Sequence, residues 1–341
     1  MKLWQKPLNS HKKTMDNKMT MQSITKIVRN NLILAGIAVL IIVTSLVEPK
    51  FLTSANIENI IRQFGTLIFV ALGMTFVIMA GFIDLSVGGI ISLVAVVTVT
   101  LIDKVGQGPA IIVGITIGLI CGLLNSFLIL TSGALTQAEA LFLTYGMSLV
   151  FGAVALIYTQ GVTQFLTYSK TDISLFNTIN SGSIGIISIS FIIFIVCLLI
   201  LYIVEKRTYI GRSIVVVGGN KVAARLAGIP ISKTIVFIYA VSGVMTAIGT
   251  VILVARVTLA SPVMGIPYMA NAILSVVVGG TALLGGKGSV LWTVMGTLLL
   301  ILMGNCLNLM GVSTYIQYML KGAILILAIW LDNRKQFSEG N

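Results

Sequence analysis

The chain has 341 residues, of which 57% are apolar and only 9% are charged, whereas soluble domains carry about 25% charged residues. This composition excludes an ordinary soluble protein and predicts an integral membrane protein. The net charge of +12 does not indicate nucleic acid as a partner, because the basic residues gather between apolar runs in the pattern that orients membrane proteins.

Ten apolar runs predict an all-α, polytopic membrane fold, because each is close to the roughly 20 residues that cross about 30 Å of hydrocarbon. Most Lys and Arg lie on segments that are inside if the N-terminus is inside, which predicts that both termini are cytoplasmic. We therefore expect a basic cytoplasmic tail over 1–30, one transmembrane domain over 31–331 and a cytoplasmic tail over 332–341. The runs are 31–47, 63–81, 85–102, 109–130, 138–158, 184–204, 234–254, 269–284, 290–306 and 315–331.

The second and third runs meet at AGFIDLSVGG, residues 80–89, where the chain is expected to break and turn back. Asp84 is the acid of this turn, and an ionised carboxylate in mid-bilayer costs about 2.5–3.5 kcal/mol, so it is expected to face water, protein or a helix end. We favour Asp84 or Ser86 as the cap of the following helix. The alternative is that Asp84 lines the solute route and hydrogen-bonds a polar solute.

A second break is expected at VGGTALLGGKGS, residues 278–289, which repeats the Gly-x-x-x-Leu-x-x-Gly spacing of the first. A true repeat would match the internal duplication that is common in transporters. Within the runs, glycines such as Gly114, Gly118 and Gly122 predict close helix approach. Residues 159–183, which are rich in Ser, Thr and Asn and carry almost no charge, are expected to form an outer connection between two halves.

A basic, glycine-punctuated segment, residues 205–233, separates two apolar runs; we call it the basic segment. Asn220 can cap a short helix, Gly228 offers a left-handed stop and Pro230 prevents continuation. A helix of about two turns is not stable alone in water, because nucleation costs more than so few hydrogen bonds return. A cytoplasmic partner protein is therefore expected to pack against it.

The sequence does not indicate catalysis or a metal or cofactor site. The cysteines, Cys121, Cys197 and Cys306, stand apart within apolar runs, and the one histidine lies in the basic tail. The segment GGKGS, residues 285–289, lacks the first glycine of a phosphate-binding loop, because Thr281 stands there. We therefore expect no catalytic residue, no metal and no cofactor bound by this chain.

Several stretches resemble the ribose-type permease subunits of bacterial ABC sugar importers, in that family's order and spacing over roughly residues 51–333. They are FLTSANIENIIRQ (51–63), ALGMTFVIMAGFIDLSVGG (71–89), GRSIVVVGGNKVAARLAGI (211–229), VVVGGTALLGGKGS (276–289) and NLMGVSTYIQYMLKGAILILAIWLD (308–332).

The resemblance implies a ten-helix permease of the bacterial inner membrane that pairs with a second permease copy or a paralogue. It would receive a monosaccharide from a periplasmic or lipid-anchored binding protein and be driven by separate ABC ATPase subunits, which bind the ATP and Mg²⁺. The helix of the basic segment would then be a coupling helix in a cleft of the ATPase; the alternative is a basic loop that only fixes topology. The implied coupling residues are Gly211, Arg212, Gly218, Gly219, Asn220, Ala223, Ala224, Arg225 and Gly228.

The substrate is not fixed by this resemblance. The family commonly has YELDAIA before its second break, whereas residues 268–274 read YMANAIL and lack both acids, so a sugar other than ribose fits as well. A competing interpretation is an ion-coupled secondary transporter, which should offer more intramembrane carboxylates than Asp84. A passive channel is a weaker third interpretation, because no filter or charged ring is present in the sequence. Uncharged polar groups suit a sugar, and the residues expected to line its route are Asp84, Ser86, Asn125, Ser126 and Asn271.

Overall fold

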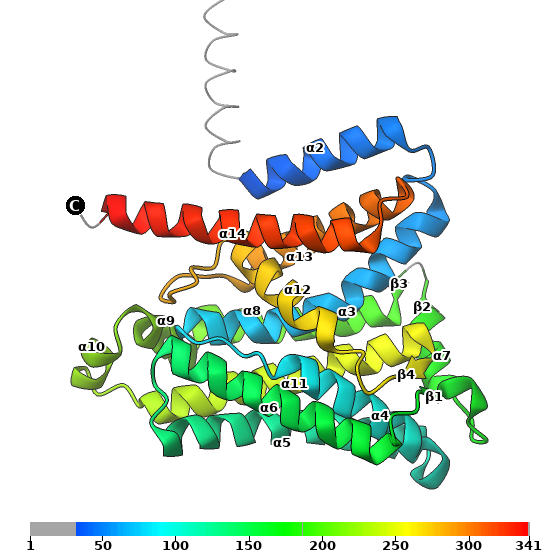
Figure 1. The fold of residues 1–341 in the computed structure, drawn as a ribbon, viewed down its shortest axis with the longest axis horizontal. Coiled ribbons are helices and arrows are strands. Elements are labelled where there is room, and N and C mark those ends of the chain that lie inside the picture. Colours follow the sequence, from blue (N-terminus) through cyan, green and yellow to red (C-terminus); the bar gives the residue numbers. More distant parts are fainter. Residues whose placement is uncertain (1–31, 186, 340–341) are drawn as a thin grey trace, which may run out of the picture.

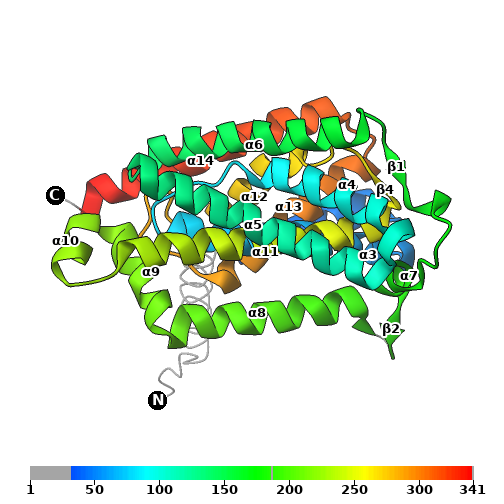
Figure 2. The same cartoon turned by 90° about the horizontal axis from the view of Figure 1, so that it is seen from below.

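The computed structural model describes residues 32–185 and 187–339, which are mostly helical. The long helices run side by side in Figure 1, and Figure 2 shows the same arrangement from below. In both views α10 (Lys221–Leu226) and the C-terminal end of α14 (Thr314–Glu339) lie at one end of the bundle. The helix α7 (Ser174–Ser181) and the short strands lie at the other end, which gives the molecule two distinct faces.

Among the described residues, seven helices are long and apolar enough to cross a membrane. Four more described helices are apolar over a shorter length, one of which, Tyr209–Gly219, lies outside the ten runs. Each of the ten runs falls at least partly on a helix, so the all-α polytopic fold is confirmed. The number of crossings and the side of the termini stay predictions. The seven are α3 (Ser54–Met79), α4 (Val87–Val105), α5 (Gln107–Ser132), α6 (Gln137–Thr159), α8 (Ile189–Arg207), α11 (Ile231–Val257) and α13 (Val290–Leu309); the shorter ones within the runs are α2 (Leu32–Val47), α12 (Ile266–Val278) and α14.

Three boundaries differ from the sequence prediction. The helix α3 begins at Ser54, nearer the N-terminus than the apolar run over 63–81. The run does not include the first turns of the helix, because those turns are rich in polar residues. The run over 269–284 ends as a helix at Val278, where glycines open the turn to α13. The helix α14 continues to Glu339, so most of the predicted tail over 332–341 is helical, whereas the basic tail over 1–30 lies outside the described residues.

The predicted outer connection is folded into short elements. Strand β1 (Gln164–Phe165) pairs antiparallel with β4 (Leu259–Ala260), which follows α11 in the second half of the chain. A 3₁₀ turn, η1 (Leu166–Tyr168), and α7 come next, and β2 (Ser183–Ile184) pairs antiparallel with β3 (Ile187–Ser188) before α8. The β1–β4 pairing ties this connection to the second half of the chain at the end of the bundle opposite α10, whereas β2 and β3 form a local hairpin.

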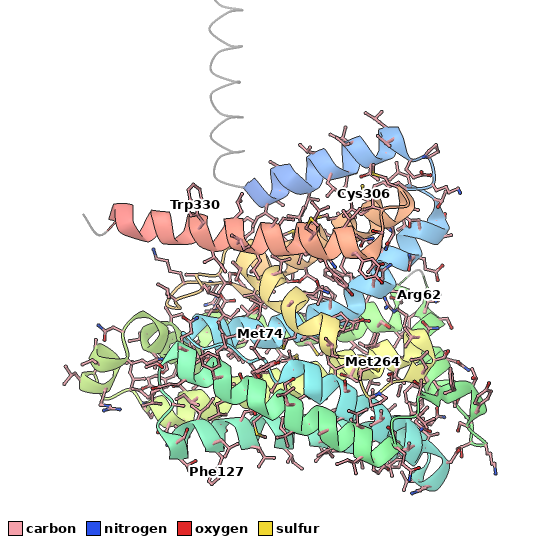
Figure 3. All side chains as sticks on the ribbon, viewed as in Figure 1. Arg62, Met74, Phe127, Met264, Cys306 and Trp330 are labelled. Carbon is pink, nitrogen blue, oxygen red and sulfur yellow. The ribbon has the colours of Figure 1, made fainter. Side chains whose placement is uncertain are left out.

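The centre of the bundle is the contact of α11 with α3 and α5. A Cβ added at Gly122 would lie 2.2 Å from the carbonyl oxygen of Tyr239, and one at Gly243 would lie 2.1 Å from that of Gly118. Only glycine allows backbones to approach so closely, so the predicted role of the glycines in α5 is confirmed. Figure 3 shows Met74 inside this packing and Phe127 at the outer surface of α5.

A reciprocal pair of amide hydrogen bonds joins α3 to α13. Asn56 Nδ2 donates to Asn305 Oδ1 at 3.0 Å, and Asn305 Nδ2 donates to Asn56 Oδ1 at 2.7 Å. Both side chains are buried, so each amide satisfies the other where water is excluded.

Candidate functional site

The basic segment folds into two helices, α9 (Tyr209–Gly219) and α10, and the predicted limits of α10 are confirmed. Asn220 Oδ1 accepts hydrogen bonds from the N–H groups of Val222 and Ala223, at 2.9 and 3.0 Å. At the other end Gly228 has φ +74°, and its N–H donates to the carbonyl oxygen of Arg225. The N–H of Ile229 donates to the carbonyl oxygen of Ala224, which completes a Schellman motif.

The helix α9 is a feature that the sequence analysis missed. Thr208 caps it, accepting from the N–H of Gly211, and Gly218 and Gly219 end it. The resemblance implied that Gly218, Gly219 and Asn220 start the coupling helix, but in the structure the two glycines end α9 and only Asn220 caps α10. Arg212 is exposed in the first turn of α9.

The exposed side chains of α10 form an apolar pair. Val222 and Leu226, four residues apart and hence on one face, are 71% and 84% exposed. Ala224 is fully buried within the chain itself, so the expectation that it meets a partner is wrong for this structure. Ala223 and Arg225 are exposed beside the pair.

The side chain of Lys221 points from α10 into the bundle. Its Nζ donates to the carbonyl oxygen of Leu135, in the turn between α5 and α6, and lies 3.9 Å from the ring centroid of Phe82. Burial lowers the pKa of the Lys221 ammonium, and the Glu139 carboxylate acts in the opposite direction. The sequence did not single out this lysine, because its distant partners leave no local signal.

The two predicted breaks contact each other beneath α9. Gly286 N–H donates to the carbonyl oxygen of Met79 at 2.9 Å, and a Cβ at Gly285 would lie 2.6 Å from the nitrogen of Gly81. Gly218 lies against both, because its Cβ would be 1.9 Å from the oxygen of Met79. We call these four glycines, Gly81, Gly218, Gly285 and Gly286, the glycine junction.

Asp84 lies at the centre of a buried polar cluster, which we define as Asp84, Ser86, Asn125 and Ser242. Its carboxylate accepts from Ser242 Oγ at 2.7 Å and from the N–H and Oγ of Ser86. Asn125 Nδ2 donates to Ser86 Oγ at 2.6 Å, so the chain of donors ends on Asp84. The arrangement satisfies a carboxylate that would otherwise be costly inside the membrane.

The predicted capping and route residues can now be placed. Ser86 does not cap α4 with its side chain, so that part of the expectation is wrong; Asp84 instead accepts the Ser86 N–H just before the helix. Asp84, Ser86, Asn125 and Ser126 are all buried, so they do not line an open route in this structure. Asn271, on α12, is half-buried.

Glu205 is a second residue that sequence reasoning missed. Its buried side chain reaches the start of α13, where Oε2 accepts from the N–H of Val290 at 2.8 Å. Lys206 Nζ lies 2.7 Å from the other oxygen. The carboxylate thus satisfies an N–H at a helix N-terminus and ties the end of α8 to the second break.

A cavity of about 610 Å³ lies at the end of the bundle opposite α10, between α3, α7 and α8. Its lining includes Arg62, which is labelled in Figure 3 and pairs with Glu58, and the aromatic rings of Phe64 and Phe194. The predicted route residues do not line this cavity. Among the side chains that the structure describes, His, Cys, Asp and Glu do not gather in groups of three that could hold a metal ion.

Comparison with known proteins identifies the family. Residues 56–329 match the family described as "Branched-chain amino acid transport system / permease component". The chain belongs to this permease family. It is 36% identical over 301 residues to the ribose import permease protein RbsC of Bacillus subtilis (strain 168), covering 88% of this chain and 91% of the relative. It is 34% identical over 309 residues to the ribose import permease protein RbsC of Escherichia coli (strain K12), covering 89% and 93%.

A third relative is named for a different sugar. The chain is 30% identical over 300 residues to the D-allose transport system permease protein AlsC of Escherichia coli (strain K12), covering 87% and 89%. The matched range contains the basic segment and both breaks. Family membership and the apolar helices make this chain a multi-pass protein of the inner membrane, and a permease component is not itself an enzyme.

Proposed function

We propose that this chain is the permease subunit of an ABC importer that carries a monosaccharide across the inner membrane. The relatives at 36% and 30% identity are named for ribose and D-allose, which supports a pentose or hexose as the substrate. The departures at residues 268–274 leave the individual sugar open. ATP and Mg²⁺ belong to the partner ATPase.

The observation that carries the proposal is the exposed face of α10. Figure 1 shows α10 standing out at one end of the bundle, and Val222 and Leu226 are 71% and 84% exposed there. Within residues 32–185 and 187–339, no segment covers these two large apolar side chains of a six-residue helix. They fit a partner with an apolar cleft, and the neighbouring Arg225 fits an acidic rim on it.

The same geometry supports alternating access driven from this face. A capped helix with a closed Schellman stop can transmit a push as a unit, since its ends do not fray. ATP-driven closure of two ATPase subunits would move the α10 helices of two permease copies, or of this chain and a paralogue, and switch the open side of the route between them. The opposite end, with α7 and the strands, would receive the sugar-binding protein.

The ion-coupled alternative needs a carboxylate that reaches the solute. Asp84 is instead enclosed by three hydroxyl and amide side chains of the polar cluster, which gives the alternative no support.

Reconstitution with the cognate ATPase and binding protein tests the proposal. Leu226→Asp places a charge in the apolar pair, so we expect loss of ATPase co-purification and at least tenfold slower sugar uptake. The matched control is Val162→Asp, because Val162 is 59% exposed in the connection at the other end of the bundle. Uptake against a gradient by the wild-type chain without the ATPase would overturn the proposal.

A further inference from the structure

The connection between α3 and α4, residues 80–86, is a non-helical segment held inside the bundle from several sides. Thr144 of α6 accepts from the N–H of Leu85 at 3.0 Å and donates to the carbonyl oxygen of Ile83 at 3.2 Å. Tyr239 Oη of α11 donates to that same oxygen at 3.5 Å. The polar cluster fixes the end of the segment through Asp84.

The start of this segment contacts the basic segment. Phe82 is fully buried, and the Lys221 ammonium lies 3.9 Å from its ring centroid, within the range of a cation–π interaction. The Phe82 ring is also 6.5 Å from that of Tyr239, in an edge-to-face arrangement. A displacement of Lys221 therefore acts on a ring that is packed against α11.

The hydrogen bond of Lys221 leads to the second break. Its acceptor, Leu135, lies in the turn between α5 and α6, and Gln137, the first residue of α6, donates through Nε2 to the carbonyl oxygen of Leu283 at 2.6 Å. One side chain of α10 thus touches the first break directly and the second break through a single turn. The exposed pair on α10 faces away from these contacts.

We infer that Lys221 is a positioning residue that couples the displacement of α10 by a partner to movement of residues 80–86. The residue does not touch the solute; it links the docking face to the segment that carries Asp84. This inference rests on the proposed function, because it requires that an ATPase move α10.

The test separates docking from coupling. Lys221→Met keeps the length of the side chain but removes its charge and its donor, while Val222 and Leu226 remain as they are. We expect the ATPase to co-purify in normal amount and to hydrolyse ATP, but hydrolysis no longer rises with sugar-loaded binding protein. The ratio of sugar imported to ATP hydrolysed should fall at least tenfold.

Two further variants make the test specific. Lys221→Arg keeps a cation and several donors, so we expect it to restore most of the transport ratio. Lys233→Met removes an exposed lysine at the start of α11 and should leave the ratio unchanged. If Lys221→Met does not give a monodisperse complex, Lys221→Gln, which keeps an N–H donor for Leu135, carries the same measurement.

The outcomes distinguish this inference from the proposed function. The role of Lys221 would be overturned if Lys221→Met bound the ATPase and kept the wild-type ratio of sugar imported to ATP hydrolysed. The same holds for Lys221→Gln where that variant is used. The docking of α10 on the ATPase would not be affected by this result. A wild-type chain that imports sugar without any ATPase would overturn the proposed function first. A purely structural role would lower complex yield and thermal stability together with transport, so an unchanged yield with a reduced ratio supports coupling.

Discussion

The carbonyl oxygen of Met79 accepts a hydrogen bond from the N–H of Gly286, at 2.9 Å. This bond joins the end of α3 to the turn between α12 and α13, two segments far apart in the sequence. Gly218 completes the contact, because a Cβ on it would lie 1.9 Å from the oxygen of Met79 and 2.6 Å from the nitrogen of Gly286. The last turn of α9 is thus in backbone contact with both breaks.

Gly218→Ala should disrupt this junction. The added methyl group meets backbone atoms, which cannot rotate away, so we expect a loss of at least about 1–3 kcal/mol of stability, typical of overpacking. Thermal unfolding in detergent and the yield of folded protein measure the effect.

The neighbouring glycine provides the control. A Cβ on Gly219 meets no atom within 4 Å of the described chain, and the residue ends the same helix. Gly219→Ala should therefore be neutral or stabilise by up to about 0.5–1 kcal/mol, as expected where glycine is replaced in a helix. Equal losses in both variants would show that the close contact at Gly218 is not what matters.

Sequence reasoning succeeded where the determinants are local. Asn220 and Gly228 cap and stop α10 through bonds to residues within a few positions, so their residue types were enough to predict them. The membrane helices were predictable because hydrocarbon length requires long apolar runs.

The features that were missed depend on distant contacts. The β-branched run Val215, Val216 and Val217 between glycines did not indicate a helix, yet α9 forms there because Ile214 and Val217 are buried against the bundle. Six residues of α10 give too little periodicity to show which side faces inward. That side is set by Lys221, whose partners come from two other turns.

The polar cluster shows the same limit. Asp84 stood out as an acid among apolar residues, but its partner Ser242 is an ordinary serine in a long helix. Only the packing of α11 against the break brings the hydroxyl to 2.7 Å from the carboxylate. The sequence therefore predicted the need for partners but not their identity.

Replacing Gly228 should uncouple transport without unfolding the bundle. Its φ of +74° is unfavourable for L residues by about 1–2 kcal/mol, and most of all for a β-branched side chain. A Cβ would meet no atom within 4 Å in the described chain, so the expected defect comes from the backbone alone. We expect Gly228→Val to slow ATP-driven uptake several-fold at normal protein yield.

The control at this position is Gly228→Asn, because asparagine adopts the left-handed region more readily than most residues. It should keep most of the uptake. If Gly228→Val transported as fast as the wild type, the stop of α10 would not be needed for coupling.

Substitutions of Asp84 separate structure from transport. Asp84→Leu leaves the donors of Ser86 and Ser242 without their acceptor, at about 1–3 kcal/mol for each buried group, so we expect little folded protein. Asp84→Asn keeps one acceptor oxygen, and Ser242 can turn to accept from the new amide. We expect Asp84→Asn to fold and to transport within about threefold of the wild type, a range of less than 1 kcal/mol.

The measurement is uptake in vesicles at equal amounts of folded protein. A folded Asp84→Asn variant with more than tenfold slower uptake would assign the charge of Asp84 to the solute route and contradict the structural role.

The amide pair between α3 and α13 allows a quantitative test of packing inside the bundle. Asn56→Leu leaves the buried amide of Asn305 unpaired. Asn305→Leu leaves Asn56 Oδ1 without its donor, although Asn56 Nδ2 keeps its bond to the carbonyl oxygen of Phe51, and each single change should cost about 1–3 kcal/mol. The double variant removes both polar groups and leaves only the carbonyl oxygen of Phe51 without its bond from Asn56. It should therefore be more stable than the sum of the two single losses predicts, with a coupling of about 0.5–3 kcal/mol.

Thermal unfolding of the four proteins in the same detergent gives this double-mutant cycle, and the cycle needs no assay of transport. Strictly additive losses would mean that water or lipid satisfies each amide separately, and that the two helices are not joined at this point. A positive coupling would instead show that α3, whose C-terminal end bonds Gly286 in the turn before α13, is also joined to α13 near its N-terminal end.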